Sequence, residues 1–154
     1  MAAKPIPSGF HTVTPYLTVQ GANKLIDFLK QAFDAKEIER MPGPDGTVGH
    51  AQLQIGDSMV MMGEASGQMK PMNCMIYLYV NDADALYKRA LQAGGTSTAE
   101  MTDQFYGDRS GAVKDPSGNV WWIATHKEDV PREEMKKRME AHMQKQQVKQ
   151  QHGA

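Results

Sequence analysis

The hydrophobic and polar positions of the chain follow the same order twice. Two short alternating runs, residues 14–19 and 75–80, are typical of strands. Each is followed by a stretch with apolar residues at three- and four-residue steps, residues 22–33 and 83–93, which predicts an amphipathic helix. Three further strand-like segments follow each predicted helix, at residues 35–41, 47–55 and 58–62 and at residues 96–101, 107–114 and 119–125.

The two halves also correspond residue by residue. Leu17 matches Leu78 and Ala22 matches Ala83, and both pairs are 61 positions apart. Glycine-containing turns join the last two strands of each half, as expected of hairpins. The pattern therefore predicts an α+β protein with two βαβββ modules, module one at about residues 12–63 and module two at about residues 73–126.

A last segment, residues 127–154, stands outside the repeat. Pro131 is suited to a helix start, and Met135, Met139 and Met143 recur every four residues. We interpret this segment as a helix whose methionine stripe packs on the body of the protein or on a partner subunit. A membrane-surface helix is the alternative, but the stripe lacks the Trp, Phe and Leu that such helices use.

The strands carry two different faces, because strand side chains alternate. One face is aliphatic and suits packing beneath the helices. In the fourth strand, Met59 and Met61 are assigned to that face and Val60 and Met62 to the other. Solvent would favour Lys and Glu on the second face, whereas the runs compared show Tyr, Met, Trp, Thr, Gln and one His. A ligand, another subunit or the rest of the sheet could cover such a face. The predicted ligand-lining residues are Tyr16, His50, Gln52, Met62, Tyr77, Tyr79 and Trp122.

Composition and charge narrow the function classes. The 154 residues contain 17 Lys and Arg and 18 Asp and Glu, a net charge of -1, so no basic excess favours nucleic acid. No apolar run is long enough to span a membrane, and the first seven residues do not resemble a secretory signal. The single cysteine, Cys74, fits a reducing compartment, and we expect a cytoplasmic protein.

Other candidate chemistry is sparse. Asp108 and Arg109 open the seventh strand, and we interpret them as an ion pair, or alternatively Arg109 as an anchor for an anionic ligand group. Ser110 has no recognisable companion base for a nucleophilic triad. Cys74 precedes an apolar strand and is expected to be a buried small residue rather than a nucleophile.

At these residues the chain resembles the vicinal oxygen chelate superfamily, which includes glyoxalase I, bleomycin-resistance proteins and extradiol dioxygenases. The resemblance rests on the doubled unit and on the runs Y-V-N-D-A-D-A-L, A-G-G and G-D-R-S-G-A-V-K-D-P-S-G-N-V-W-W-I. It covers about residues 10–126 and implies one domain whose two modules form a curled, cup-like mixed sheet with the helices outside. It also implies a homodimer.

The resemblance implies a metal site that this sequence does not reproduce. Metalloenzymes of the family use His, Gln or Glu at four strand positions. These positions fall here on Thr14, Met75, Trp122 and Val60, or on Met61 if the register slips by one. None of these side chains is a competent ligand for the metals concerned, so we expect no metal and no other cofactor.

Two functions remain open. The first is binding of a small organic molecule in the sheet cleft without a metal, with no reaction catalysed. The alternative is a metal-dependent lyase, isomerase or dioxygenase with a displaced site, for which His50, Gln52 and Glu64 are candidate ligands. A pure dimerisation module, with its aromatic face filled by protein, is a third reading.

Overall fold

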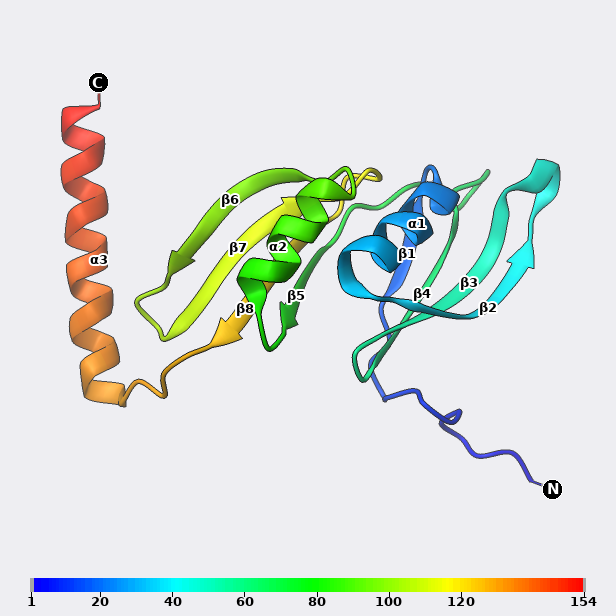
Figure 1. Ribbon diagram of the computed structural model, residues 1–154, viewed down its shortest axis with the longest axis horizontal. Coiled ribbons are helices and arrows are strands. Elements are labelled where there is room, and N and C mark those ends of the chain that lie inside the picture. The colour runs from blue at the N-terminus through cyan, green and yellow to red at the C-terminus, as the bar shows by residue number, and fades with distance from the viewer. Residues whose placement is uncertain (1, 154) are drawn as a thin grey trace.

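The structure is a computed structural model that describes residues 2–153, and it contains the two predicted modules (Figure 1). The predicted order of elements is confirmed, with ends that differ by up to two residues. The first module contains β1 (Tyr16–Val19), α1 (Ala22–Phe33), β2 (Lys36–Pro42), a single 3-10 turn η1 (Pro44–Gly46), β3 (Val48–Ile55) and β4 (Ser58–Glu64). The second contains β5 (Met75–Tyr79), α2 (Ala83–Gln92), β6 (Thr96–Asp103), β7 (Asp108–Lys114) and β8 (Val120–His126).

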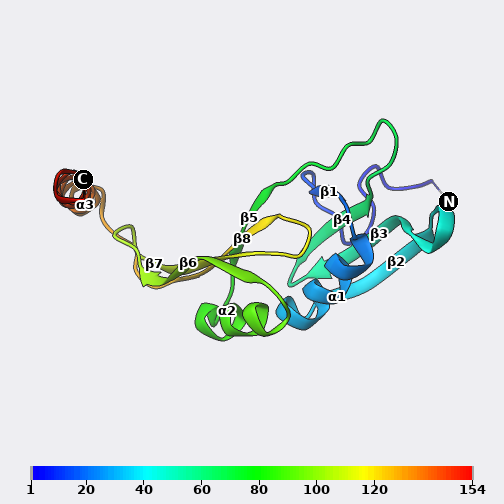
Figure 2. The ribbon, with the colours of Figure 1, turned by 90° about the horizontal axis from the view of Figure 1, so that it is seen from above.

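Both modules have the same sheet topology. The strand order is β1-β4-β3-β2 in one and β5-β8-β7-β6 in the other. The first and last strands of each module pair in parallel, and the remaining neighbours are antiparallel. The two sheets are separate, and α1 and α2 cover the same side of both (Figure 2). Each sheet therefore has one face under a helix and one face free of helices.

The core lies between the helices and the sheets, where the two modules meet. Phe33 at the end of α1 packs against Trp121 of β8, with ring centroids 5.3 Å apart. Trp121 is completely buried, and its indole N–H donates to Asp115 at 2.7 Å. This contact ties the second module to the first through a large apolar surface.

The D-P-x-G-N run closes the second module through its own side chains. The Asp115 carboxylate accepts the backbone N–H groups of Ser117 and Asn119. Asn119 in turn accepts the backbone N–H of Cys74, just before β5. A buried carboxylate with several donors is well satisfied, so this turn sets the geometry of the β7–β8 hairpin and the start of β5.

The two helices begin on side chains from the last strand of their own module. The Glu64 carboxylate of β4 accepts the N–H groups of Gly21 and Ala22, both at 2.8 Å, at the start of α1. The Thr125 hydroxyl of β8 accepts the N–H of Ala83 at the start of α2. Both contacts satisfy helix N–H groups that have no partner within the helix.

The C-terminal helix α3 (Arg132–His152) stands beside the body (Figure 1). Arg138 holds it there by two hydrogen bonds of 2.9 Å to Glu128. Met135 is partly buried, whereas Met139 and Met143 are exposed, so these two methionines of the stripe do not pack on the body as one alternative predicted. The partner-subunit alternative stays a prediction. Within residues 2–153, no helix has the length and apolar character needed to cross a bilayer.

Candidate functional site

Strand pairing decides which side chains lie on the helix-free faces. Residues paired across neighbouring strands share a face. Met62 pairs with Leu17 and Ala51 and is completely buried under α1. The assignment of Met62 to the ligand face was therefore wrong, and Met61, paired with Tyr16, lies there instead. The error is a shift of one residue, which moves every side chain of a strand to the other face.

The same pairing shows how the modules correspond. Met61 lies beside Tyr16 in the first module as Trp122 lies beside Tyr77 in the second. Met61, rather than Val60, is thus the counterpart of Trp122. The shift arises because Met61 is the fifth residue after the turn glycine Gly56, whereas Trp122 is the fourth residue after Gly118.

Asp108 and Arg109 do not pair with each other, because neighbouring residues of a strand point to opposite faces. Arg109 lies on the helix side and binds Asp84 of α2 at 2.8 and 2.9 Å and Asp103 at 3.3 Å. These contacts raise the pKa of Arg109. Arg109 is an ion-paired residue away from the other predicted lining residues. Asp108 lies on the helix-free face.

The helix-free face of the second module carries an aromatic cluster, which we define as Tyr77, Tyr79 and Trp122. The rings of Tyr77 and Trp122 are stacked, with centroids 6.3 Å apart and 13° between their planes. The ring of Tyr79 lies 5.2 Å from that of Tyr77. Tyr79 is two-thirds exposed, so the cluster presents flat apolar area to solvent.

A buried carboxylate organises this cluster. Asp108 is 4% exposed, and its Oδ2 accepts the hydroxyl groups of both Tyr77 and Tyr79 at 3.0 Å. Its Oδ1 contacts Nδ1 of His126 at 2.8 Å, and Nε2 of His126 contacts Asp129 at 2.9 Å. The two tyrosines, the acid and the histidine therefore form one hydrogen-bonded unit.

The pKa shifts of the groups in this unit agree with its hydrogen bonds. Burial would raise the pKa of Asp108, but hydrogen bonds from His126, Tyr79 and Tyr77 outweigh it and lower the pKa. Hydrogen bonds to Asp108 and then Asp129 raise the pKa of His126. Burial and then the neighbouring Tyr106 hydroxyl raise the pKa of Tyr77, Ser110 lowers it, and the contact with Asp108 raises it further. The phenols thus stay protonated, the acid charged, and the imidazolium is favoured.

Sequence reasoning did not identify Asp108 and His126 as members of the site. The signal was nevertheless present, because the Asp115–Gly118 turn determines the register of β7 and β8. In that register Asp108 pairs with His126 and Ser110 with Ala124. Counting outward from the turn would have placed both titratable groups on the face of Trp122.

The helix-free face of the first module brings three predicted residues together, and their hydrogen bonds centre on a histidine rather than on a carboxylate. The Tyr16 hydroxyl contacts Nδ1 of His50 at 3.2 Å, and the Gln52 amide contacts Nε2 of the same ring at 3.2 Å. Gly63 leaves room for the Tyr16 hydroxyl, since a Cβ there would lie 3.0 Å from it. Unlike the second module, this cluster contains no carboxylate.

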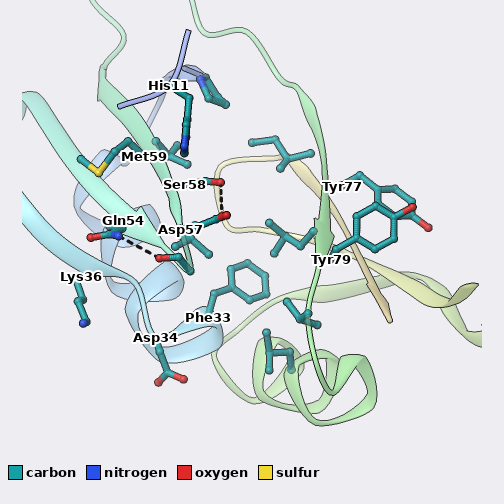
Figure 3. Close-up of a pocket in the computed structure, with 18 of the residues that line it drawn as sticks. His11, Phe33, Asp34, Lys36, Gln54, Asp57, Ser58, Met59, Tyr77 and Tyr79 are labelled. Atoms are coloured by element: carbon teal, nitrogen blue, oxygen red, sulfur yellow. Dashed lines mark hydrogen bonds between the residues drawn. The ribbon is translucent and has the colours of Figure 1, made fainter. Parts of the chain in front are cut away.

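A cavity of about 960 Å³ lies between the modules (Figure 3). Phe33 and Leu78 contribute to its apolar wall, and Asp57 and Ser58 to its polar rim. Tyr77 and Tyr79 border it, but in Figure 3 their rings project away from it on the other side of β5. The cavity and the aromatic cluster are therefore two separate surfaces.

The residues at the family's metal positions do not suit a cation. Thr14 donates to the His11 carbonyl, Met75 is a thioether, and Trp122 offers an aromatic ring. Divalent metals of this kind take imidazole, carboxylate or thiolate donors. Glu64, considered for a displaced site with His50 and Gln52, is instead bound to the start of α1. No group of three or more His, Cys, Asp or Glu suited to an ion occurs among residues 2–153.

Comparison with known proteins agrees with this architecture. The model of the Glyoxalase/Bleomycin resistance protein/Dioxygenase superfamily matches residues 9–123, which leaves α3 outside the match. Uncharacterized proteins of Mycobacterium bovis and Mycobacterium tuberculosis are 38% identical over 138 residues. These cover 82% of this chain and 91% and 81% of theirs.

Solved structures share the fold at low sequence identity. TioX from Micromonospora sp. ML1 has a TM-score of 0.65 at 24% identity, covering 75% of this chain and 98% of its own. TnmS3 from Streptomyces sp. CB03234, described as an antibiotic binding protein, has a TM-score of 0.61 at 21% identity. That match covers 82% of this chain and 98% of TnmS3.

Proposed function

The chain belongs to the glyoxalase/bleomycin resistance protein/dioxygenase superfamily, and from this premise we propose that it binds a small, flat organic molecule without a family-type metal ion. The binding surface is the helix-free face, with the aromatic cluster Tyr77, Tyr79 and Trp122 at its centre. The stacked and exposed arrangement of these rings is the single observation that carries the proposal.

The chemistry of the face supports a binder. Aromatic side chains bury large apolar area and favour offset stacking on another flat ring. Met61, on the corresponding face of the first module, adds an adaptable apolar contact. TnmS3, which shares the fold, is described as an antibiotic binding protein, and this supports binding of a small organic molecule.

The donor chemistry at the family's metal positions supports binding rather than metal-dependent catalysis. Thr14, Met75 and Trp122 supply neither imidazole nor carboxylate, and burial raises the pKa of the Cys74 thiol, with the charge of Asp115 adding to the shift. A thiol with a raised pKa is a poor nucleophile. Because a free cysteine fits a reducing compartment, we propose that the protein is cytoplasmic.

We further propose that the chain is a homodimer. Met75 is 68% exposed on the helix-free side of the edge strand β5, and Ile76 and Leu78 on the side that faces α2 are only partly buried. Contiguous exposed apolar area of this kind is typical of interaction surfaces. Light scattering on the purified chain should give twice the mass of 17.1 kDa, and a monomeric mass at micromolar concentration would refute the dimer.

Thermal-shift screening of the full chain with aromatic antibiotics and flat aromatic metabolites tests the binding function. A ligand that binds the folded chain raises its midpoint as its concentration exceeds Kd. Trp122→Ala should abolish the shift, whereas Tyr87→Phe, a conservative change on α2, should retain it. A shift that persists in Trp122→Ala would contradict the proposed surface.

Metal analysis tests the other half of the proposal. Protein purified without chelators should contain far less than one divalent ion per chain. One tightly held ion per chain, lost together with ligand binding on chelation, would contradict metal-free binding.

A further inference from the structure

The hydrogen bonds of the aromatic cluster restrict the chemical class of its ligand, and this inference rests on the binding function proposed above. We propose that the face of the second module selects a flat organic cation, with a quaternary or protonated nitrogen in or on an aromatic ring system. The reasons are the hydrogen-bond inventory of the cluster, its charge, and its contrast with the first module.

The two tyrosines have no proton left to donate. Each phenol has one O–H group, and both Tyr77 and Tyr79 donate it to Oδ2 of Asp108. Their oxygens retain lone pairs, and their ring faces carry the negative side of the aromatic quadrupole. Toward a ligand, these residues therefore offer acceptors and electron-rich surfaces.

The charged groups around the cluster also favour a cationic ligand over an anionic one. Asp108 and Asp129 flank a single imidazole, His126, so the unit carries a net charge of about -1 when that ring is protonated. Both ring nitrogens then donate to carboxylates, and neither N–H is free for a ligand. Lys114 shares the face, but it lies six residues from Asp108 along β7, a separation of about 20 Å.

Four other polar side chains nearby are engaged in two pairs. Gln104 donates to the Ser110 hydroxyl at 3.2 Å, and Glu128 is bound to Arg138. A cation held over the face of Tyr or Trp, within about 6 Å of the ring centroid, is attracted by the ring quadrupole, and more strongly when water is excluded. An anion at the same place would meet ring faces, phenol lone pairs and the nearby carboxylates, with the hydroxyls of Tyr106 and Ser110 beside Tyr77 as neutral donors.

The first module provides an internal contrast. Because the Gln52 amide nitrogen donates to Nε2 of His50, the ring's proton lies on Nδ1 and is directed at the Tyr16 oxygen. The hydroxyl proton of Tyr16 is then available to a ligand. The same position in the fold is thus a donor in one module and an acceptor in the other.

Three probes with one ring system test the inference on the full chain by calorimetric titration at pH 7. They are N-methylquinolinium, uncharged quinoline and quinoline-4-carboxylate. We expect the cation to bind at least about tenfold more tightly than quinoline, and the carboxylate to bind most weakly. Asp108→Asn should lower the affinity for the cation until it is close to the affinity for quinoline, and the affinity for quinoline itself should change little.

A second variant avoids any folding defect from the buried site. The side chain of Asp129 is fully exposed, and Asp129→Asn should reduce the preference for the cation about two- to fivefold. The matched control is Asp103→Asn, an exposed aspartate that binds Arg109 on the helix side, which should keep the wild-type preference.

The outcomes separate this inference from the function on which it rests. Equal affinity for all three probes, or tighter binding of the carboxylate, overturns cation selection while binding of flat molecules stands. An unchanged cation preference in both Asp108→Asn and Asp129→Asn also overturns it. Failure of all three probes overturns the ligand class, and only failure of the wider aromatic panel overturns the binding function as well.

Discussion

The two modules have the same order of elements and the same positions for their aromatic residues, but different partners for them. Tyr16 and Tyr77 occupy equivalent places beside Met61 and Trp122. In the first module the tyrosine is hydrogen-bonded to a histidine, and in the second two tyrosines are bound to a buried acid. The repeat therefore determines where a ligand-facing side chain stands, while its hydrogen-bond partner determines the charge and donor character it presents.

The modules also differ in how firmly their helices are packed. Seven residues of α1 are buried, whereas only Ala83 and Ala90 of α2 are. The residues of β5 that face α2, such as Ile76 and Leu78, are only partly buried. The second module is thus the more open of the two, and its stability depends strongly on Trp121, which packs against Phe33 of the first module.

The largest expected difference is in the loss of unfolding free energy between substitutions of Trp121 and Trp122, which lie on opposite faces of β8. Trp121→Ala removes a fully buried ring and its bond to Asp115, and should cost about 3–5 kcal/mol of unfolding free energy. Trp122→Ala removes a partly buried ring stacked on Tyr77 and should cost about 1 kcal/mol. Urea unfolding monitored by circular dichroism measures both. Equal losses would show that the faces of β8 are not as described.

The two methionines of β4 test the register of the first module. Met62→Ala should cost about 2–4 kcal/mol, because the cavity forms beneath α1. Met61→Ala should cost less than about 1 kcal/mol and instead weaken ligand binding. Chemical denaturation of the two variants measures these losses. A larger loss of unfolding free energy for Met61→Ala would show that Met61, rather than Met62, lies on the face beneath α1.

The helix starts offer a smaller, matched comparison between the modules. Glu64→Ala removes a charged acceptor from two N–H groups and should cost about 1–2 kcal/mol. Thr125→Val removes a neutral hydroxyl of similar shape and should cost about 0.5–1.5 kcal/mol. Thermal unfolding can rank the two. A greater loss at Thr125 would contradict the stronger role of the charged contact.

The smallest expected effect is a pH dependence specific to the second module. The carboxylates of Asp108 and Asp129 raise the pKa of His126, so its stabilising contribution is complete below its unfolded value of about 6.5. That contribution is lost as pH rises through the folded pKa. Unfolding free energy should therefore decline across this window, and His126→Gln should flatten the decline.

Asp129→Asn serves as the companion measurement for this titration. Removing one of the two carboxylates should move the decline to lower pH without abolishing it. Identical pH profiles for the wild type and both variants would show that His126 contributes nothing to the pH dependence.

Much of the fold could be predicted from the chain because its signals are local. Helix periodicity, strand alternation and turn residues identified both modules, and the D-P-x-G-N run marked a turn that Asp115 closes with its own side chain. For β1, β3, β5 and β8 the aliphatic and aromatic residues separated the two faces. In β4 they did not, because methionine fits either face equally well.

The sequence by itself determined the repeated topology, the family and the aromatic character of one sheet face, since each depends on spacing within a short segment. Only the tertiary structure decided that Met61 rather than Met62 reaches that face, that Arg109 binds Asp84 of α2, and that the hydroxyls of Tyr77 and Tyr79 meet on Asp108. These facts depend on the register between strands, where one residue of turn length exchanges the two faces of a strand. The position of α3 was likewise decided by a contact distant in the chain, in which Arg138 donates to the Phe105 carbonyl at 3.4 Å.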